Sequence, residues 1–165
     1  QAQVMTASSP HQRAPEQSEI YFNAGGWRVR IAQAGINLAG ALIIWLAFFS
    51  EGHVGSFGEQ VFVWLMGALA PLAMAAMTLY VRAYVVRMRL EGGLEVTTLD
   101  VLGRRSFKLD PAMADFGAVE RDRRGVDNSW MLMRAPGELL PFIVDVSAAR
   151  IEPGALQRAV ARGRK

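Results

Sequence analysis

The side chains that could do chemistry are few and lie far apart along the chain. The only imidazoles belong to His11 and His53, and there is no cysteine. Without cysteine the chain cannot form a disulfide, a thiolate metal site or an iron–sulfur cluster. Either histidine could ligate a metal or a haem, but a long apolar segment separates the two, so they cannot share one site. We interpret both as ordinary loop histidines and expect no cofactor.

A second chemical candidate is an amide pair, Gln33 and Asn37, within an otherwise apolar stretch. Their spacing of four places both on one face of a helix. Unsatisfied amides are costly in hydrocarbon, so such residues are a hint of function. A quinone or proton pathway would need an ionisable group nearby, and none accompanies them. We favour hydrogen bonding to a second helix or to a neighbouring subunit.

Motifs for catalysis do not accompany these residues. The sequence has no phosphate-binding loop, no HExxH, no GxSxG and no paired catalytic carboxylates. The basic run ERDRRG has no interleaved aromatic residues, which indicates a solvated turn rather than a nucleic-acid-binding patch. We therefore expect a protein that is not an enzyme and does not bind nucleic acid.

Two uncharged apolar stretches dominate the element pattern, at residues 31–49 and 61–81. As a helix, each would cross the roughly 30 Å of bilayer hydrocarbon. A short glycine-rich loop joins them, so the two helices must be antiparallel neighbours. The sequence thus predicts a two-helix transmembrane hairpin over residues 27–83.

Small residues in the first stretch indicate how the helices would pack. Gly35 and Ala39 form a small-xxx-small pair, Gly40 extends it, and Asn37 lies between them. Such surfaces allow helix backbones to approach closely. We predict that Gly35, Asn37, Ala39 and Gly40 contact the second span.

Charges around the spans predict an orientation. The connecting loop carries Glu51 and Glu59 with no Lys or Arg, whereas both flanking segments are net positive. Positive flanks stay on the side of synthesis, so both termini should face the cytoplasm or the mitochondrial matrix. Retention of this topology is a sufficient role for the flanking arginines, and binding of anionic lipid headgroups such as cardiolipin is the alternative. These residues are Arg28, Arg30, Arg82, Arg87 and Arg89.

The tail, residues 84–165, changes to the two-residue period of strands. VVRMRL and LEVTTL flank a glycine turn, and RRSFKL, residues 115–119, SWMLM and LLPFIV follow between turn signals. Pro141 indicates that the last strand lies at an edge or starts late. EPGALQRAVARG predicts a closing helix. We expect a small, mainly antiparallel α+β soluble tail of about six strands.

The leader, residues 1–26, shows neither a strand period nor a helix period, so we expect it to be irregular. Ordering it would cost about 1–2 kcal/mol of backbone entropy per residue. If ordered, it should therefore lie along neighbouring subunits and leave Val4, Met5, Ile20 and Tyr21 exposed in the isolated chain. The chain begins at Gln1 rather than Met, so a removed targeting peptide is one interpretation.

The order of these parts resembles a family of mitochondrial inner-membrane assembly factors that includes transmembrane proteins seventy and two-two-three. The stretch VVRMRLEGGLEVTTLDVLGRRSFKL is similar to the family's strand, glycine turn, Thr-rich strand and Phe-containing third strand. FIVDVSAARIEPGALQRAV is similar to its closing strand and helix. The likeness covers residues 28–160, is closest to the branch associated with cytochrome c oxidase assembly, and transfers no catalytic residue.

This resemblance implies a non-catalytic accessory subunit or assembly factor of a respiratory-chain complex, such as cytochrome c oxidase or a supercomplex. The protein would lie in the mitochondrial inner membrane, with both termini in the matrix and other subunits of the complex as partners. The alternative is a bacterial inner-membrane module with cytoplasmic termini, whose pleckstrin-like tail binds lipid or a partner protein. An Arg-rich presequence before Gln1 would favour the mitochondrial reading.

Overall fold

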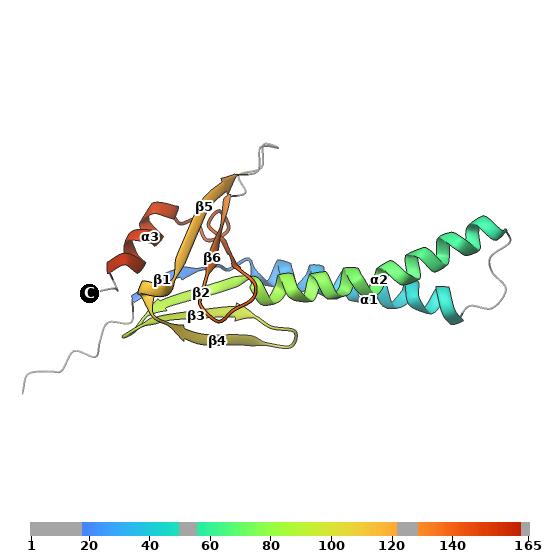
Figure 1. Cartoon of the computed structure of the whole chain (residues 1–165), viewed down its shortest axis with the longest axis horizontal. Coiled ribbons are helices and arrows are strands. Elements are labelled where there is room, and N and C mark those ends of the chain that lie inside the picture. The colour runs from blue at the N-terminus through green and yellow to red at the C-terminus, as the bar shows by residue number, and fades with distance from the viewer. Residues whose placement is uncertain (1–17, 50–55, 122–128, 163–165) are drawn as a thin grey trace, which may run out of the picture.

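The computed structural model describes residues 18–49, 56–121 and 129–162. Figure 1 shows a pair of long helices that projects from one end of a β-rich domain. The elements in chain order are β1 (Ser18–Phe22), α1 (Gly26–Phe49), α2 (Phe57–Ala83), β2 (Val85–Leu90), β3 (Leu94–Leu99), β4 (Arg104–Leu109), the 3-10 turn η1 (Pro111–Met113), β5 (Asp115–Arg121), β6 (Ser129–Arg134), β7 (Phe142–Asp145) and α3 (Pro153–Arg162).

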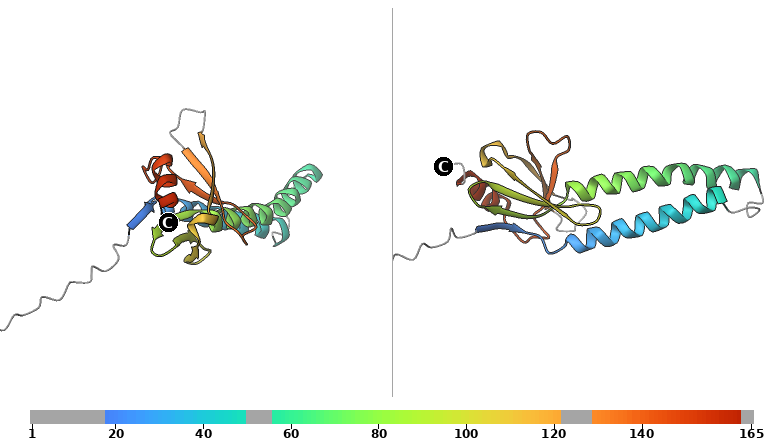
Figure 2. Two further views of the ribbon diagram at one scale, coloured as in Figure 1. Left: turned by 60° about the vertical axis from the view of Figure 1, so that its left-hand side comes forward. Right: turned by 90° about the horizontal axis from the view of Figure 1, so that it is seen from below.

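The helices α1 and α2 pack against each other as a hairpin (Figures 1 and 2). Both are long and apolar enough to cross a membrane, and only 11% of the apolar window of each is buried within the chain. Large side chains instead point outward, among them Leu38 at 75% and Leu72 at 65% exposure. The core helix of a water-soluble domain would bury such residues.

The start of α2 is fixed by a capping box. The Ser56 hydroxyl accepts a hydrogen bond from the Glu59 amide, and the Glu59 carboxylate accepts one from the Ser56 amide. Two amides that would otherwise lack a partner at the helix start are thereby satisfied. The helix therefore begins at a definite residue after the connecting loop.

Small residues do form the helix contact, but they lie on a different stripe from the one predicted. The buried residues of α1 are Gly26, Gln33 and Gly40, spaced seven apart. This is the repeat with which two helices keep one face together. Gly35 and Ala39 are exposed, and a Cβ built on Gly35 would meet nothing within 4 Å.

Two glycines bring the helix backbones close together. A Cβ on Gly40 would lie 2.7 Å from the Met74 sulfur, and one on Gly67 would lie 2.7 Å from the Cβ of Ala47. The predicted contact face is thus wrong for Gly35 and Ala39, whereas Gly40 lies within the contact and Asn37 at its half-buried margin. A small-xxx-small pair shows that close approach is feasible on a face, but the partner helix selects the face.

The β-rich domain consists of two antiparallel sheets, with strand orders β1-β2-β3-β4 and β5-β6-β7. Side chains of both sheets and of α3 meet in one core, and its members include Met88, Val96, Met131, Val144 and Leu156, all 0% exposed. The alternating burial of β6 and β7 follows from the two-residue period of strands. The predicted antiparallel tail with a closing helix is confirmed. β7 starts at Phe142, directly after Pro141, at the edge of its sheet.

The hairpin is inserted between two neighbouring strands of one sheet. β1 ends at Phe22, just before α1 begins at Gly26, and α2 ends at Ala83, just before β2 begins at Val85. β1 and β2 pair antiparallel. The helices therefore continue into adjacent strands without a long linker, and the segments before and after the hairpin lie at the same end of it.

The prediction of an irregular leader is wrong for its last residues. Ser18–Phe22 form β1, Tyr21 is only 2% exposed, and Ile20 packs against the core. The expected exposure of Ile20 and Tyr21 is therefore wrong as well, while Val4 and Met5 lie outside the described residues. The sequence of this strand, SEIYF, has three consecutive apolar residues and no two-residue alternation, and the strand pairs with the chain's own β2.

Candidate functional site

The junction between the hairpin and the β-rich domain contains a buried polar network. The Asn23 amide nitrogen donates to the Tyr84 hydroxyl at 2.8 Å and lies 3.4 Å from the Tyr21 hydroxyl. Tyr84 donates to the Asp145 carboxylate at 3.1 Å, and Tyr21 donates to the Asp145 carbonyl at 3.0 Å. Asn23 also accepts from the Gly25 amide at 2.7 Å. The network thus joins β1, the end of α2 and the end of β7.

Both phenols of this network remain protonated far above neutral pH. Burial raises the pKa of Tyr21 and of Tyr84, and the negative charge of Asp145 raises each further. The second carboxylate oxygen of Asp145 accepts from the Ser147 hydroxyl at 2.8 Å and the Ala148 amide at 2.9 Å. The phenols therefore act as hydrogen-bond donors, and this cluster holds three elements together.

A second set of contacts joins both helices to the β3–β4 turn, residues 100–103. The Arg30 guanidinium of α1 donates to the carbonyls of Asp100, at 3.0 Å, and of Gly103. The Arg82 guanidinium of α2 lies 3.2 Å from the Asp100 carboxylate. Hydrogen bonds from the Val101 amide and from Arg82 hold the pKa of Asp100 below its usual range. Two arginines from two different helices therefore bind the same turn.

The predicted basic collar therefore divides into different roles. Arg30 and Arg82 hold the β3–β4 turn, and Arg87 pairs with Glu19 across β1 and β2. Arg28 instead lies over the Trp27 ring, 5.6 Å from its centroid. Arg30, Arg82 and Arg87 thus bind acceptors within the chain, whereas Arg28 is exposed and Arg89 is half-buried on β2.

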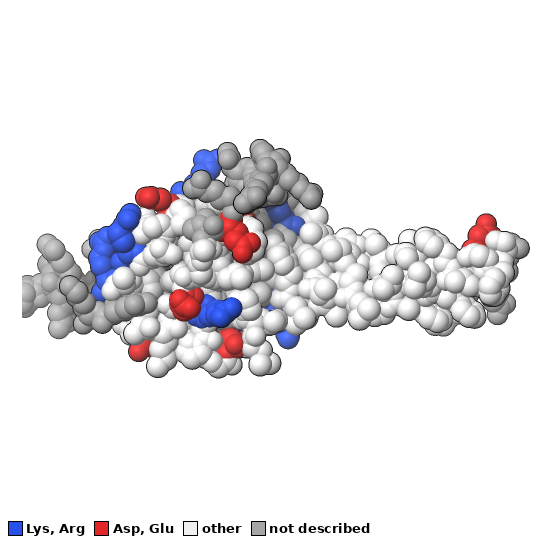
Figure 3. Space-filling view, turned by 45° about the horizontal axis from the view of Figure 1, so that its top comes forward, with Lys and Arg blue, Asp and Glu red and all other residues white. Residues whose placement is uncertain are grey.

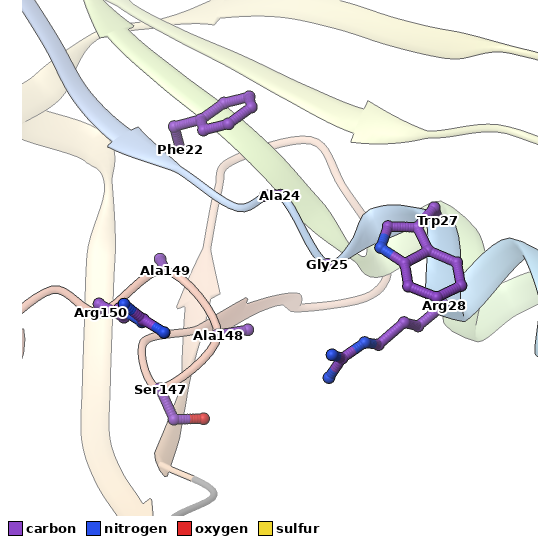
Figure 4. A pocket seen from close by; sticks show the side chains of 9 residues that line it. All are labelled: Phe22, Ala24, Gly25, Trp27, Arg28, Ser147, Ala148, Ala149 and Arg150. Carbon is purple, nitrogen blue, oxygen red and sulfur yellow. The ribbon is translucent and has the colours of Figure 1, made fainter.

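A shallow pocket of about 530 Å³ opens beside the start of α1. Figure 4 shows Arg28 and Arg150 reaching into the space between the start of α1 and the loop after β7. Trp27 and Phe22 form its apolar wall. Arg150 has φ 52°, in the left-handed region that non-glycine residues seldom adopt, so the loop turns sharply there. Two cations beside an aromatic ring suit a small anionic group.

The described residues offer little for metal or redox chemistry. Within them, no group of three or more His, Asp and Glu side chains lies close enough to hold a metal ion. His11 and His53 both fall outside the described ranges. Gln33 is buried at 5% exposure on the contact stripe of α1. What the junction can do chemically is donate hydrogen bonds and carry positive charge.

Charge is distributed unevenly over the molecule. In Figure 3 the hairpin is bare of charge along its length, with acidic atoms at its far tip, and Lys and Arg appear only over the β-rich domain. Glu59 accounts for the described acid at the tip of α2, and Arg82 for the base at its other end. The polar and apolar parts of the surface therefore meet at the junction.

Comparisons with protein-family models, with curated proteins and with solved structures gave no match for this chain. The sequence resemblance to respiratory-chain assembly factors therefore has no further support.

Sequence reasoning missed the polar network, because its members are separated by the whole hairpin and by most of the tail. One local signal does exist. Asn23 precedes Gly25 and Gly26 directly before a helix, which is a position where Asn satisfies helix-start amides. Nothing near Tyr84 or Asp145 in the sequence indicates that they meet.

Proposed function

We propose that this chain is a non-catalytic, membrane-anchored accessory protein that holds its β-rich domain in a fixed orientation at the membrane surface for other subunits of a membrane complex. The observation that carries the proposal is the direct continuation of both apolar helices into neighbouring strands. With so few residues between helix and strand, the orientation of the helices in a bilayer dictates the orientation of the domain.

The contacts at the junction reinforce this coupling. Arg30 and Arg82 attach one turn of the domain to both helices, and Tyr84 attaches the end of α2 to Asp145 in the other sheet. An anchor that only tethered the domain would not need contacts from two helices to two sheets. Such contacts are useful where a partner must meet the domain in one pose.

The outward apolar side chains of the helices support the location in a membrane. In water their exposure would be costly, at about 25 cal/mol for each Å² left unburied. In a bilayer the same surface meets lipid, and a helix pairs most of its own backbone groups, with one bond lost at Pro71 of α2. The charge distribution favours the domain on the cytoplasmic or matrix side and the Glu59 end on the opposite side.

A respiratory-chain complex is the first candidate partner, because the sequence resemblance points to assembly factors of cytochrome c oxidase. One observation favours the alternative of a bacterial module with a pleckstrin-like tail. The two antiparallel sheets of the tail, closed by α3, have the outline expected for such a tail. Fold alone does not assign a function, so the partner decides between these readings.

Native electrophoresis of the tagged full chain in a mild detergent tests the proposal. The chain should comigrate with subunits of a respiratory complex, identified by mass spectrometry. The double variant Arg30→Ala/Arg82→Ala should stay in the membrane fraction and comigrate less. Arg158→Ala, which removes an exposed salt bridge between Arg158 of α3 and Glu152 just before that helix, is the matched control. Migration of the wild-type chain alone, with complexes unchanged by its deletion, would contradict the proposal.

The orientation can be tested separately, because the chain has no cysteine of its own. Gly58→Cys places a thiol near the tip of the hairpin, where a side chain meets open space. Ala112→Cys places one on the exposed 3-10 turn of the domain. A membrane-impermeant reagent should label them from opposite sides, and labelling from the same side would rule out the hairpin topology.

A further inference from the structure

Two loops at one end of the β-rich domain expose large apolar side chains. In the β3–β4 turn, Val101 is 40% and Leu102 is 97% exposed. In the β6–β7 loop, residues 135–141, Leu139 is 101% and Leu140 is 46% exposed. We refer to these two segments as the apolar loops. Single exposed leucines are ordinary, but four apolar side chains at one end need an explanation.

The register of β3 places its turn alongside the hairpin. The Leu99 amide donates to the Tyr84 carbonyl at 3.1 Å, so the last residue of β3 is level with the end of α2. β3 runs toward the hairpin, and the turn that follows therefore lies beyond this level, beside the helices. Figures 1 and 2 both show it projecting past the point where α2 meets β2.

The β6–β7 loop lies at the same end of the domain. Ile143 forms a parallel bridge with Tyr84, where the chain leaves the hairpin. β7 therefore also runs away from the hairpin, and the loop before it lies on the hairpin side. Glu138 of this loop pairs at 3.0 Å with Arg105 of β4, two residues after the β3–β4 turn, so this loop lies near the start of β4.

The β3–β4 turn is held at the level where the apolar surface of the hairpin ends. Arg30 and Arg82 are the first charged residues beyond the uncharged stretches 31–49 and 61–81, and both bind this turn. Val101 and Leu102 thus continue the apolar surface of the helices sideways. Arg104, exposed directly after the turn, adds a cation beside the apolar tip.

We propose that the apolar loops insert into the interfacial layer of the bilayer that the hairpin spans, and so give the β-rich domain a second attachment to the membrane. This inference rests on the membrane location in the proposed function. The occupant is lipid, because the exposed leucines continue the lipid-facing surface of the hairpin and Arg104 is placed to meet lipid phosphates. The second attachment would prevent the domain from tilting about the base of the hairpin.

Environment-sensitive labels on single cysteines test the insertion. The full chain is reconstituted in vesicles of phosphatidylcholine and phosphatidylglycerol that contain lipids spin-labelled either near the headgroup or deep in the acyl chain. A nitrobenzoxadiazole label is attached to Leu102→Cys or Leu139→Cys. Ala112→Cys, on the exposed 3-10 turn, is the water-exposed control, and Leu42→Cys in α1 is the control for insertion of the hairpin.

Labels at positions 102 and 139 should emit at shorter wavelength and be quenched several-fold more by the spin-labelled lipid than the label at 112. If position 42 is quenched while 102 and 139 behave like 112, the hairpin is inserted and the loop proposal is wrong. If position 42 is also unquenched, the membrane location itself fails. Blue-shifted but unquenched labels at 102 and 139 would mean that protein, not lipid, covers the loops, which also overturns the proposal.

Discussion

The hairpin and the β-rich domain place their apolar residues in opposite ways. In the domain, Leu94 and Leu156 are fully buried, whereas in the hairpin Leu38 and Leu72 point outward. Burial of apolar side chains, which drives folding in water, holds the domain together. In the bilayer that we propose for the hairpin, lipid is as apolar as the helix side chains, and close backbone approach replaces that driving force.

This comparison shows that the same residue type affects stability differently in the two regions. Buried leucines stabilise the domain through the contacts of its core, whereas the leucines named on the hairpin point away from the chain. A glycine is a local weakness in a soluble helix, yet Gly40 and Gly67 make the helix contact possible. The junction between them uses both devices, a buried apolar cluster that includes Val81 and Leu99 and a close approach at Gly26, and adds buried hydrogen bonds.

The largest expected effect on stability comes from shortening a buried leucine of the domain, and an exposed leucine of the hairpin is the comparison. Leu156→Ala should destabilise the domain by about 2–5 kcal/mol, because it leaves a cavity between α3 and both sheets. Leu38→Ala in α1 should change stability little. Thermal unfolding of the detergent-solubilised chain, followed by tryptophan fluorescence, measures both. Equal losses in the two variants would mean that the exposed face of the hairpin is packed against protein.

Enlarging a glycine at the contact between the two helices should destabilise the hairpin. Gly67→Leu places a side chain against Ala47, at a position where even a Cβ would be 2.7 Å away, so the helices must separate. We expect a loss of about 1–3 kcal/mol. Gly35→Leu, which meets open space, is the matched control. Distances between spin labels near the two helix tips should increase only for the first variant, and an increase for both would place Gly35 in the contact.

Removing the junction phenol should have an intermediate effect. Tyr84→Phe leaves Asn23 and Asp145 each without one hydrogen-bond partner in a buried site, at a cost of about 1–3 kcal/mol. The phenols also predict a pH dependence. Their folded pKa values are raised, so stability is complete below about pH 10, where free tyrosine ionises, and falls as the pH rises further.

Alkaline unfolding of the wild-type chain and of Tyr84→Phe measures that dependence. The variant should start less stable and lose stability less steeply with pH, because one of the two phenols of the polar network is gone. Identical slopes would show that Tyr84 does not ionise differently in the folded and unfolded states.

The smallest effect on stability is expected from removing the ion pair between Arg82 of α2 and Asp100 of the β3–β4 turn. Arg82→Ala and Asp100→Asn remove an exposed ion pair, and such pairs contribute little in water and less in salt. The melting temperature should therefore hardly change. A spin label on the domain should nevertheless show a broader range of positions relative to the hairpin, and an unchanged range would mean that the short connections alone fix the orientation.

The sequence by itself determined the elements whose signal is local. Two uncharged stretches specify the hairpin, and alternation between turns specifies the strands from β2 to β7, with Pro141 setting a late start for the last of them. The short strand β1 was not predicted, because its apolar residues Ile20, Tyr21 and Phe22 are consecutive and show no two-residue alternation. Its burial depends on β2, on the other side of the hairpin.

The tertiary structure alone decided which surfaces meet. A helix turns by about 100° for each residue, so a shift of one residue moves the contact from the face of Gly35 and Ala39 to the stripe through Gln33 and Gly40. The composition of α1 does not indicate which of the two faces contacts α2, since both are rich in small residues. The network of Tyr84 and Asp145 and the placement of the apolar loops likewise arise from contacts between residues far apart in the chain, which no local pattern encodes.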